Sequence, residues 1–358
     1  MTAEASTPAP HESARIDWGR VGRVLIVKLR SIGDTVLATP SLDAFRRFLP
    51  EAKIDILLED WVAPLLEGHP SVDEVISVGR DLGDRLAVAR ELRRRRYDVA
   101  FNLHGGATAT FFVRASGARH RVGYRSYRYS FLYDRLLASA EDFWRRGGLH
   151  SVERQLALLG FVGVPMDDLP PSSLPITEAG LSDRVRQWHE RGSYAVLHPA
   201  TAFFTKQWPV ENFARTAEHL AEKGLDVIAL ASAGEADILA QLKAAVHADI
   251  TTFDDLSLPE ITALLSRAEI FVGNDSGIAH ISAAVRCRTV VAFGSSNREH
   301  WRPWTDAPSE TVFVPFSCQP CPGYVCEEFG DAPCILTVSP AAVNAAIDRI
   351  LPCQNRER

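Results

Sequence analysis

At residues 24–34 the chain reads Val24-Leu25-Ile26-Val27-Lys28-Leu29-Arg30-Ser31-Ile32-Gly33-Asp34. The apolar run at its start is typical of a strand that is buried on both faces. A short polar loop follows this run, and apolar residues then recur at helical spacing until Pro50. This order of a buried strand, a short loop and an amphipathic helix predicts an α/β fold with a parallel sheet.

The same order of elements recurs along the chain. In the first half, apolar runs at 54–58 and 99–103 predict two more strands. In the second half we expect strands at 194–197, 227–230, 270–272 and 289–293, a helix at 259–268, and a final helix that begins at Ser339-Pro340. Two successive α/β units of this kind predict a cleft between two domains, with ligands near the carboxyl ends of the strands.

A proline-rich segment at 169–175 separates the two halves. We therefore expect one Rossmann-like domain at 19–175 and a second at 176–338, followed by a helix and tail at 339–358. Residues 1–18 are rich in Ala, Ser, Thr, Pro and Glu, and this composition predicts a disordered tail. The length of 358 residues is suited to two domains.

The charge of the chain is unevenly distributed. The formal net charge is −6, yet an arginine run occupies 93–96 and further arginines crowd 114–128. These basic stretches suggest an anionic partner, such as phosphate groups or a membrane surface, although a solvated helix face is the simpler explanation for 93–96. No apolar run approaches the ~20 residues of a membrane span, and the N-terminus lacks the apolar region of a signal peptide. We expect a cytoplasmic protein with no nucleic-acid partner.

Asp34 is the first residue that could carry chemistry. It follows the first predicted strand and lies near the start of the next helix. At that place a carboxylate could act as a general base beside the cleft, or it could cap the helix, since Asp is a favoured N-cap residue. Residue type alone leaves both roles open.

Two segments of the second half could bind phosphate. Lys206 precedes a predicted helix, where an ammonium group and free backbone N–H groups would suit a phosphate, although a solvated surface lysine is the simpler explanation. The turn Asn274-Asp275-Ser276-Gly277 joins a strand to a helix rich in small residues, with His280 one turn further on. Small residues allow a phosphate or ribose to approach the backbone, while a capped turn would look similar. Neither half carries G-x-G-x-x-G, which disfavours a dinucleotide dehydrogenase.

Four cysteines cluster late in the chain. They are Cys318, Cys321, Cys326 and Cys334. The first two have metal-ligand spacing, and four thiolates could hold a structural zinc or iron ion. The last two lack that spacing, so free or redox-paired thiols are the alternative.

Together these segments resemble glycosyltransferase family 9, the heptosyltransferases that build the inner core of lipopolysaccharide. The resemblance runs in family order from about residue 22 to about residue 351. It rests on residues 24–36, on Tyr97-Asp98-Val99-Ala100, on Gly117-Ala118-x-x-Arg121-Val122-Gly123-Tyr124, on Lys206-x-Trp208-Pro209 and on Asn274-Asp275-Ser276-Gly277-x-x-His280. No single motif is decisive, but their order and spacing are specific.

The resemblance implies a GT-B fold, with two Rossmann-like domains whose parallel sheets face an interdomain cleft. It implies that the first domain binds the acceptor and that the second binds a nucleotide-sugar donor. The expected reaction is an inverting transfer of heptose from ADP-heptose to an anionic glycolipid acceptor of the lipopolysaccharide inner core, at the cytoplasmic face of the inner membrane. No cofactor or metal is expected to be required for catalysis.

The resemblance also assigns roles to residues. It makes Asp34 the general base that takes a proton from the acceptor hydroxyl. It makes Lys206 the group that offsets charge on the leaving diphosphate. The remaining expected donor ligands are Thr201, Glu235, Asp275, Ser276, Gly277 and His280. The expected acceptor ligands are Ser31, Arg121 and Arg125.

One segment departs from the family pattern. Where members commonly show Asp-Leu-Gln-Gly followed by a basic residue, this chain reads Asn102-Leu103-His104-Gly105-Gly106. That region helps to hold the anionic acceptor, so the departure leaves the standard acceptor in question. The alternatives are a transferase of the same family that uses another nucleotide sugar or another glycan, and a non-catalytic nucleotide-sugar-binding protein of envelope assembly.

Overall fold

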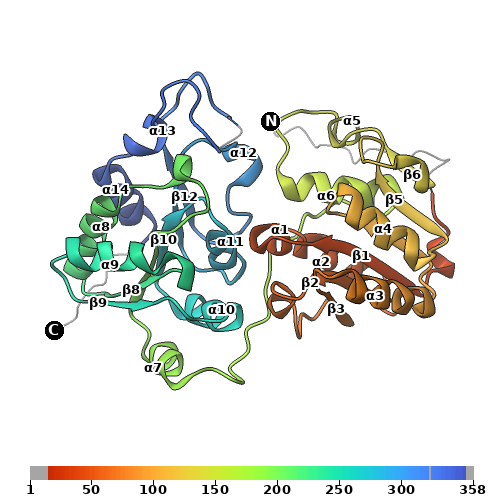
Figure 1. Cartoon of the computed structure of the whole chain (residues 1–358), viewed down its shortest axis with the longest axis horizontal. Helices are drawn as coiled ribbons and strands as arrows, with labels where there is room; N and C mark the ends of the chain where they lie inside the picture. Colours follow the sequence, from red (N-terminus) through yellow and green to blue (C-terminus); the bar gives the residue numbers. More distant parts are fainter. Residues whose placement is uncertain (1–14, 322–323, 352–358) are drawn as a thin grey trace. The chain divides into compact units, whose positions relative to one another are not determined.

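A computed structural model describes residues 15–321 and 324–351 of the chain. Most of the tail that we predicted at 1–18 lies outside the described residues, as does 352–358. The chain divides between Pro175 and Ile176 into two compact units, drawn from red to yellow and from green to blue in Figure 1. We call them the N-terminal unit and the C-terminal unit.

The N-terminal unit is built on a six-stranded parallel sheet in the order β3-β2-β1-β4-β5-β6. Its strands are β1 (Arg23–Leu29), β2 (Lys53–Glu59), β3 (Glu74–Val78), β4 (Val99–Asn102), β5 (His120–Tyr124) and β6 (Arg135–Leu137). Its helices are α1 (Ile32–Val36), α2 (Thr39–Phe48), α3 (Leu82–Arg95), α4 (Gly106–Ser116), α5 (Ala140–Trp144) and α6 (Ser151–Phe161), with short 3₁₀ turns η2 (Trp18–Arg20), η3 (Ala63–Leu65) and η4 (Ser130–Leu132).

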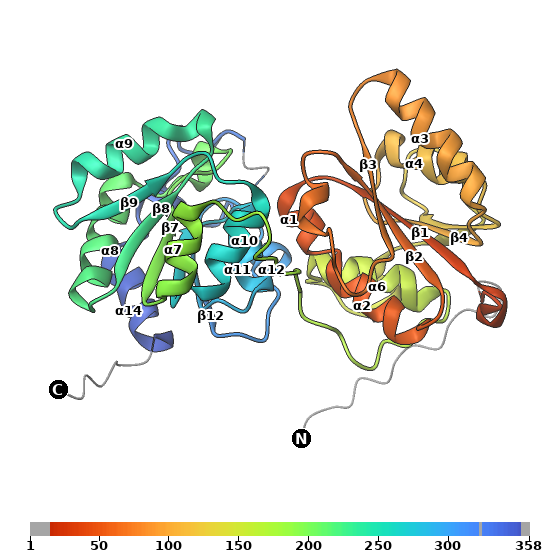
Figure 2. The same cartoon turned by 90° about the horizontal axis from the view of Figure 1, so that it is seen from below.

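Helices cover both faces of this sheet. Figure 2 shows α3 and α4 on one face and α2 and α6 on the other. On the first face, Leu25 and Val27 of β1 pack with Leu92 of α3 and Phe112 of α4. Because both faces are covered, β1 is apolar at nearly every position, as its sequence predicts.

The C-terminal unit repeats this architecture. Its six parallel strands lie in the order β12-β11-β10-β7-β8-β9. They are β7 (Tyr194–His198), β8 (Asp226–Leu230), β9 (Ile250–Phe253), β10 (Ile270–Asn274), β11 (Thr289–Phe293) and β12 (Ser309–Phe313). The helices are α7 (Asp183–Arg191), α8 (Val210–Glu222), α9 (Ala236–Ala245), α10 (Leu258–Arg267), α11 (Gly277–Ala284), α12 (Arg298–Trp301), α13 (Pro333–Leu336) and α14 (Pro340–Ile350), with 3₁₀ turns η5 (Phe204–Lys206) and η6 (Ala233–Glu235).

The final helix packs within the C-terminal unit. Ser339 is its N-cap and accepts a hydrogen bond from the backbone of Ala342, as the sequence predicts. The helix α14 lies against α8 and β12, and Val343 and Ile347 enter the core beside the fully buried Trp208. Trp208, two residues before the start of α8, is therefore a packing residue, and its indole donates to the carbonyl oxygen of Val338 at 2.7 Å.

Two sequence expectations change in detail. The helix expected after the first loop is two helices, because α1 ends at Val36 and α2 begins at Thr39. The arginine run at 93–96 closes α3, with three of its members in the last turn of the helix. Cations are favoured there by the helix dipole, and Arg95 is paired with Glu74 and Glu91. A local structural role therefore accounts for part of that basic run.

Both units have the strand order of a doubly wound fold. In each, the first strand of the unit (β1 or β7) lies next to the fourth (β4 or β10), and the chain winds outward in opposite directions from that pair. The carboxyl ends of such a pair form the crevice where ligands bind in open α/β sheets. The loops after β1, β4, β7 and β10 are therefore the places to look for a site.

Candidate functional site

In the N-terminal unit, the loop after β1 brings three side chains together. The Lys28 ammonium lies 3.0 Å from Oδ1 of Asp34, and the Ser31 hydroxyl donates to Oδ2 of Asp34 at 3.1 Å. Lys28 also donates to the carbonyl oxygen of Leu103 at 3.0 Å, which ties this loop to the end of β4. The Lys28 side chain is 4% exposed while that of Asp34 is 33% exposed. The buried ammonium therefore fixes the carboxylate from the protein interior, and the carboxylate remains accessible to a ligand.

Asp34 is not the N-cap of α1. That position belongs to Ser31, and Asp34 lies in the first helical turn without capping the backbone. Burial acts to raise the pKa of Asp34, but the charge and hydrogen bond of Lys28 and the hydrogen bond of Ser31 act the other way, and the net pKa is lowered. Asp34 is therefore an ionised acceptor of protons at neutral pH.

The loop after β4 completes the same crevice. The side-chain oxygen of Asn102 accepts hydrogen bonds from the backbone of His104 and Gly105 at 3.0 and 2.8 Å. Burial, with the nearby charge of Lys28, lowers the pKa of His104, which favours a neutral imidazole. The departure from the family pattern thus places a neutral ring beside the charged pair of Lys28 and Asp34.

A cavity of about 390 Å³ opens at this crevice. Lys28, Asp34 and His104 line it together with Tyr124, the last residue of the motif at 117–124. The sequence did not single out the other polar residues of the lining, namely Ser126, Tyr127, Ser139, Glu141, Ser151, Arg154 and Gln155. Arg154 is paired with Glu141. These residues come from the end of β5, from α5 and from α6, so only the folded sheet brings them near Asp34.

The three expected acceptor ligands lie in different settings. Ser31 contacts Asp34 directly. Arg121 is outside the cavity lining, because its guanidinium is bound to the carbonyl oxygens of Leu132 and Ala118 and to Asp134. Arg125 is exposed and lies between Tyr124 and Ser126, which both line the cavity.

In the C-terminal unit, Lys206 and Asp275 form an ion pair. The Lys206 ammonium lies 2.7 Å from Oδ2 of Asp275, and the two side chains are 17% and 6% exposed. The Ser296 hydroxyl donates to the same carboxylate oxygen. Lys206 is therefore not a solvated surface lysine. It lies at the carboxyl edge of the sheet, next to the start of α11.

Asn274 holds the two loops of this site together. Its side-chain oxygen accepts from the backbone of Trp208 at 3.0 Å, and its side-chain nitrogen donates to the carbonyl oxygen of Pro199 at 2.8 Å. A Cβ added at Gly294 would lie 2.3 Å from the carbonyl oxygen of Thr205. Only glycine therefore permits the end of β11 to approach the loop that carries Lys206.

The remaining expected donor ligands gather around the same strand ends. Ser276 is the N-cap of α11, which begins at Gly277, and its hydroxyl lies 3.3 Å from Nδ1 of His198. Burial lowers the pKa of His198 to about 4, and the charge of Glu235 opposes this shift. Glu235 accepts from the Ser232 hydroxyl at 2.6 Å. His280 is buried one turn into α11, and Thr201 is half-buried in the loop after β7.

The four clustered cysteines line one small cavity of about 10 Å³. Burial and the neighbouring thiols raise the pKa of Cys334. Within residues 15–321 and 324–351, no three His, Cys, Asp or Glu side chains are grouped so as to hold a metal ion. The expected zinc or iron site at Cys318, Cys321, Cys326 and Cys334 is therefore not supported, because the side chains share a cavity without forming a ligand set.

Comparison with known proteins identifies the family of the chain. Residues 85–330 match the model of glycosyltransferase family 9 (heptosyltransferase). Lipopolysaccharide heptosyltransferase 3 of Escherichia coli K12 is 27% identical over 300 residues, which cover 78% of this chain and 84% of the relative.

Solved structures show the same fold. The structure of E. coli ADP-heptose lps heptosyltransferase II has a TM-score of 0.76 at 21% identity and covers 92% of this chain and 98% of its own. A glycosyl transferase family 9 structure from Veillonella parvula DSM 2008 has a TM-score of 0.79 at 18% identity, with 92% and 97% covered. These likenesses bear out the GT-B class. With more than half of its length matched by the family model, the chain belongs to glycosyltransferase family 9 (heptosyltransferase).

Proposed function

We propose that this protein transfers a heptose from ADP-heptose to a hydroxyl group of a lipopolysaccharide inner-core acceptor, with inversion at the anomeric carbon. The observation that carries the proposal is the Lys206–Asp275 ion pair at the start of α11, in the ligand-binding crevice of the C-terminal sheet. The relatives described above, lipopolysaccharide heptosyltransferase 3 and ADP-heptose lps heptosyltransferase II, suggest the sugar and the donor class.

The C-terminal unit would bind the donor. The backbone N–H groups at the start of α11 and the Lys206 ammonium offer positive charge to a diphosphate. Ser276, Gly277 and His280 would contact the same group, and Thr201 would add a hydroxyl. Glu235 would bind the ribose from the end of β8. Since this charge comes from the protein, we propose that transfer requires no divalent cation, and activity should survive excess chelator.

The N-terminal unit would supply the base. The Asp34 carboxylate takes the proton of the acceptor hydroxyl as its oxygen forms a bond to the anomeric carbon of the heptose. The bond between that carbon and the diphosphate oxygen breaks at the same time, and ADP leaves with the electron pair. A single displacement of this kind inverts the anomeric configuration. Lys206 stabilises the negative charge that grows on the leaving diphosphate.

A second candidate is the same transfer to another glycan. His104 stands where the family commonly has a glutamine, and both cations that line the cavity, Lys28 and Arg154, are already paired with carboxylates. These features suit an uncharged sugar at this cavity. For either acceptor, the enzyme would work at the cytoplasmic face of the membrane that carries the glycolipid. Among the described residues, no helix combines the length and the apolar character of a membrane span.

The proposal is tested by Asp34→Asn. We expect turnover with ADP-heptose and an acceptor glycolipid to fall by about 10²- to 10⁴-fold, the usual contribution of a general base. The variant should retain the thermal shift that the donor produces, because a ligand that binds only the folded state raises its apparent stability. Asp183→Asn, at an exposed carboxylate of α7, is the matched control and should keep full activity.

The donor is tested by a thermal-shift panel of nucleotide sugars. ADP-sugars should stabilise the protein and UDP- or GDP-sugars should not. If turnover survived the Asp34→Asn substitution, the assignment of Asp34 as the general base would be wrong. If a UDP- or GDP-sugar stabilised the protein instead, the assignment of ADP-heptose as the donor would be wrong. Donor binding without turnover on any glycan would identify a non-catalytic binding protein instead.

A further inference from the structure

One stretch of the N-terminal unit carries a positive charge, opposite to the net charge of the whole chain. Between Asp98 and Asp134 there are five arginines and no acidic residue, although the whole chain has a net charge of −6. The guanidinium of Arg121 forms an ion pair with Asp134 inside the unit and is not available to a partner. In the part of the chain that the structure describes, the other four, Arg114, Arg119, Arg125 and Arg128, form no ion pair. All four are exposed and therefore available to an external anion.

Exposed aromatic rings lie among these arginines. Phe131 is 78% exposed, more than any other phenylalanine that the structure describes. Its ring lies 6.3 Å from that of Tyr129, and the Arg128 guanidinium lies over the Tyr129 ring at 5.1 Å. A single exposed apolar residue is ordinary, but several exposed rings among polar or charged residues indicate an interaction surface.

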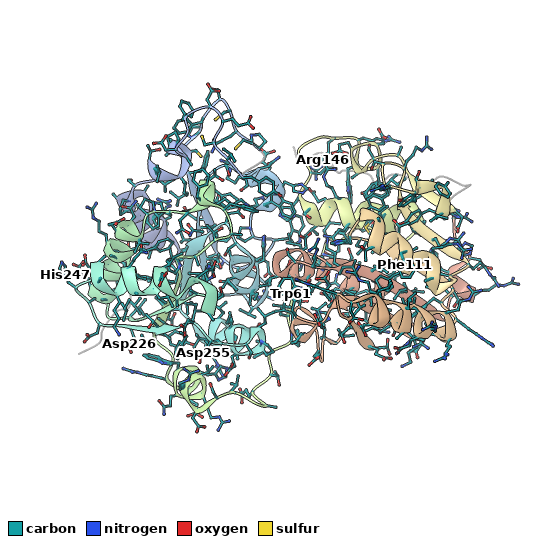
Figure 3. The ribbon with its side chains drawn as sticks, viewed as in Figure 1. Trp61, Phe111, Arg146, Asp226, His247 and Asp255 are labelled. Atoms are coloured by element: carbon teal, nitrogen blue, oxygen red, sulfur yellow. The ribbon has the colours of Figure 1, made fainter. Side chains whose placement is uncertain are left out.

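Helix α4 extends this surface. The Thr110 hydroxyl lies 3.4 Å from the carbonyl oxygen of Arg128, so the helix borders the aromatic segment. The next residue, Phe111, is 41% exposed and is labelled in Figure 3. Arg114 follows three residues later, on the same helical face. We call Phe111, Arg114, Arg128, Tyr129 and Phe131 the aromatic–arginine surface.

We propose that this surface docks the enzyme on a bilayer that contains anionic lipids. Arginine and aromatic side chains together suit the boundary between headgroups and acyl chains, because the guanidinium binds phosphate while the ring enters the apolar region. Charge complementarity favours a membrane, since an acidic protein with a local arginine cluster is attracted to negative lipid by that cluster alone.

The position of the surface deepens the proposed function, on which this step of the inference rests. Tyr124, Ser126 and Tyr127 line the cavity beside Asp34, and Arg128 follows directly in the chain. Tyr127 is anchored by a hydrogen bond to the carbonyl oxygen of Asn102 at 3.2 Å. One short segment therefore forms a wall of the cavity and then carries the aromatic–arginine surface. A glycolipid acceptor anchored in the bilayer would have its sugars next to that wall.

The test is vesicle flotation of the full chain, with phosphatidylcholine vesicles compared with vesicles that also contain phosphatidylglycerol. Wild type should bind the anionic vesicles and lose that binding as salt rises from about 50 to 500 mM, since screening shortens the range of the attraction. Arg128→Glu combined with Phe131→Ser should reduce the bound fraction by about tenfold or more, as each arginine near a membrane surface is worth about fivefold. Thermal unfolding with and without ADP verifies that the variant is folded.

The matched control combines Arg215→Glu with Leu336→Ser, which are an exposed arginine and a 45% exposed leucine of the C-terminal unit. It should bind vesicles like wild type. Equal loss in both variants, equal binding to neutral and anionic vesicles, or a change of oligomeric state in place of lipid binding would overturn the proposal. Flotation needs neither donor nor turnover, so its outcome is independent of the transferase proposal.

Discussion

Lys28 is a buried lysine whose ammonium contacts the Asp34 carboxylate and the Leu103 carbonyl oxygen. A buried charge is tolerated when it is paired and hydrogen-bonded. In return, the pair holds Asp34 in one orientation and lowers its pKa below the ordinary value of 3.8. We therefore regard Lys28 as a positioning residue that keeps the proposed base, Asp34, ionised.

This role predicts a change in pH dependence. Lys28→Met removes the charge and the hydrogen bond that lower the pKa of Asp34, while burial still raises it. The acid limb of the kcat/KM profile should therefore move to higher pH, because Asp34 would become protonated at a pH where the wild type is still ionised. Initial rates measured from pH 4 to pH 8 would show the shift.

The matched control is Lys53→Met, at a lysine of the same unit that pairs with Asp73 away from the cavity. Its acid limb should coincide with that of wild type. A profile that is identical in Lys28→Met and wild type would show that Lys28 does not set the ionisation of the base.

The sequence predicted the local candidates of the site better than their partners. Asp34 and Asp275 are recognisable because each follows a predicted strand, and Lys206 is recognisable because it precedes a predicted helix. Arg154 and Ser296 could not be recognised from the sequence, because neither belongs to a motif. Each comes close to Asp34 or Asp275 only when the sheet has formed. The pairing of Lys206 with Asp275 joins positions 69 residues apart, a contact that periodicity cannot reveal.

At the scale of elements, the strands with continuous apolar runs were predictable and the edge strands were not. Strands β1, β2, β7, β10 and β11 lie inside their sheets, and because both of their faces are buried, each contains a run of apolar residues. Strands β3 and β12 lie at sheet edges, and several of their residues are exposed or half-buried. Their mixed composition gives no continuous apolar signal.

The N-terminus of α10 permits a quantitative test of helix capping. The backbone of Glu260 donates to the Ser257 hydroxyl, and the Glu260 carboxylate accepts from the backbone of Ser257 at 3.0 Å. Ser257→Ala should lower the free energy of unfolding by about 1 kcal/mol, because one backbone N–H loses its cap. Chemical denaturation of both proteins would measure the difference.

Helix α7 offers the control for this measurement. Its N-cap is also a serine, Ser182, but the Ser182 hydroxyl caps no backbone N–H group. Ser182→Ala should therefore change the free energy of unfolding by no more than about 0.5 kcal/mol. Equal losses in the two variants would contradict the assignment of the cap energy to the hydrogen bond.

At the scale of the molecule, two units with the same strand order are proposed to bind different substrates. ADP should therefore protect amides in only one of them. We expect slower hydrogen exchange at 199–208 and at 274–280, where the loops after β7 and β10 would contact the nucleotide, and unchanged exchange around 28–34. Exchange measured by mass spectrometry with and without ADP would show this. If ADP protected residues 28–34 and not the C-terminal loops, the proposal that the C-terminal unit binds the nucleotide would be wrong.

The Lys206–Asp275 pair has a consequence for selectivity. The Lys206 ammonium is already paired with the Asp275 carboxylate at 2.7 Å, so a phosphate that bound there, as we propose, would have to compete with that carboxylate. A small anion that offers one contact gains little by this exchange. A nucleotide sugar can recover the loss through its ribose, base and sugar, since selectivity is a difference between affinities. In the presence of abundant free phosphate, an anion site that is already paired in this way would exclude most of the phosphate and would still bind the larger ligand.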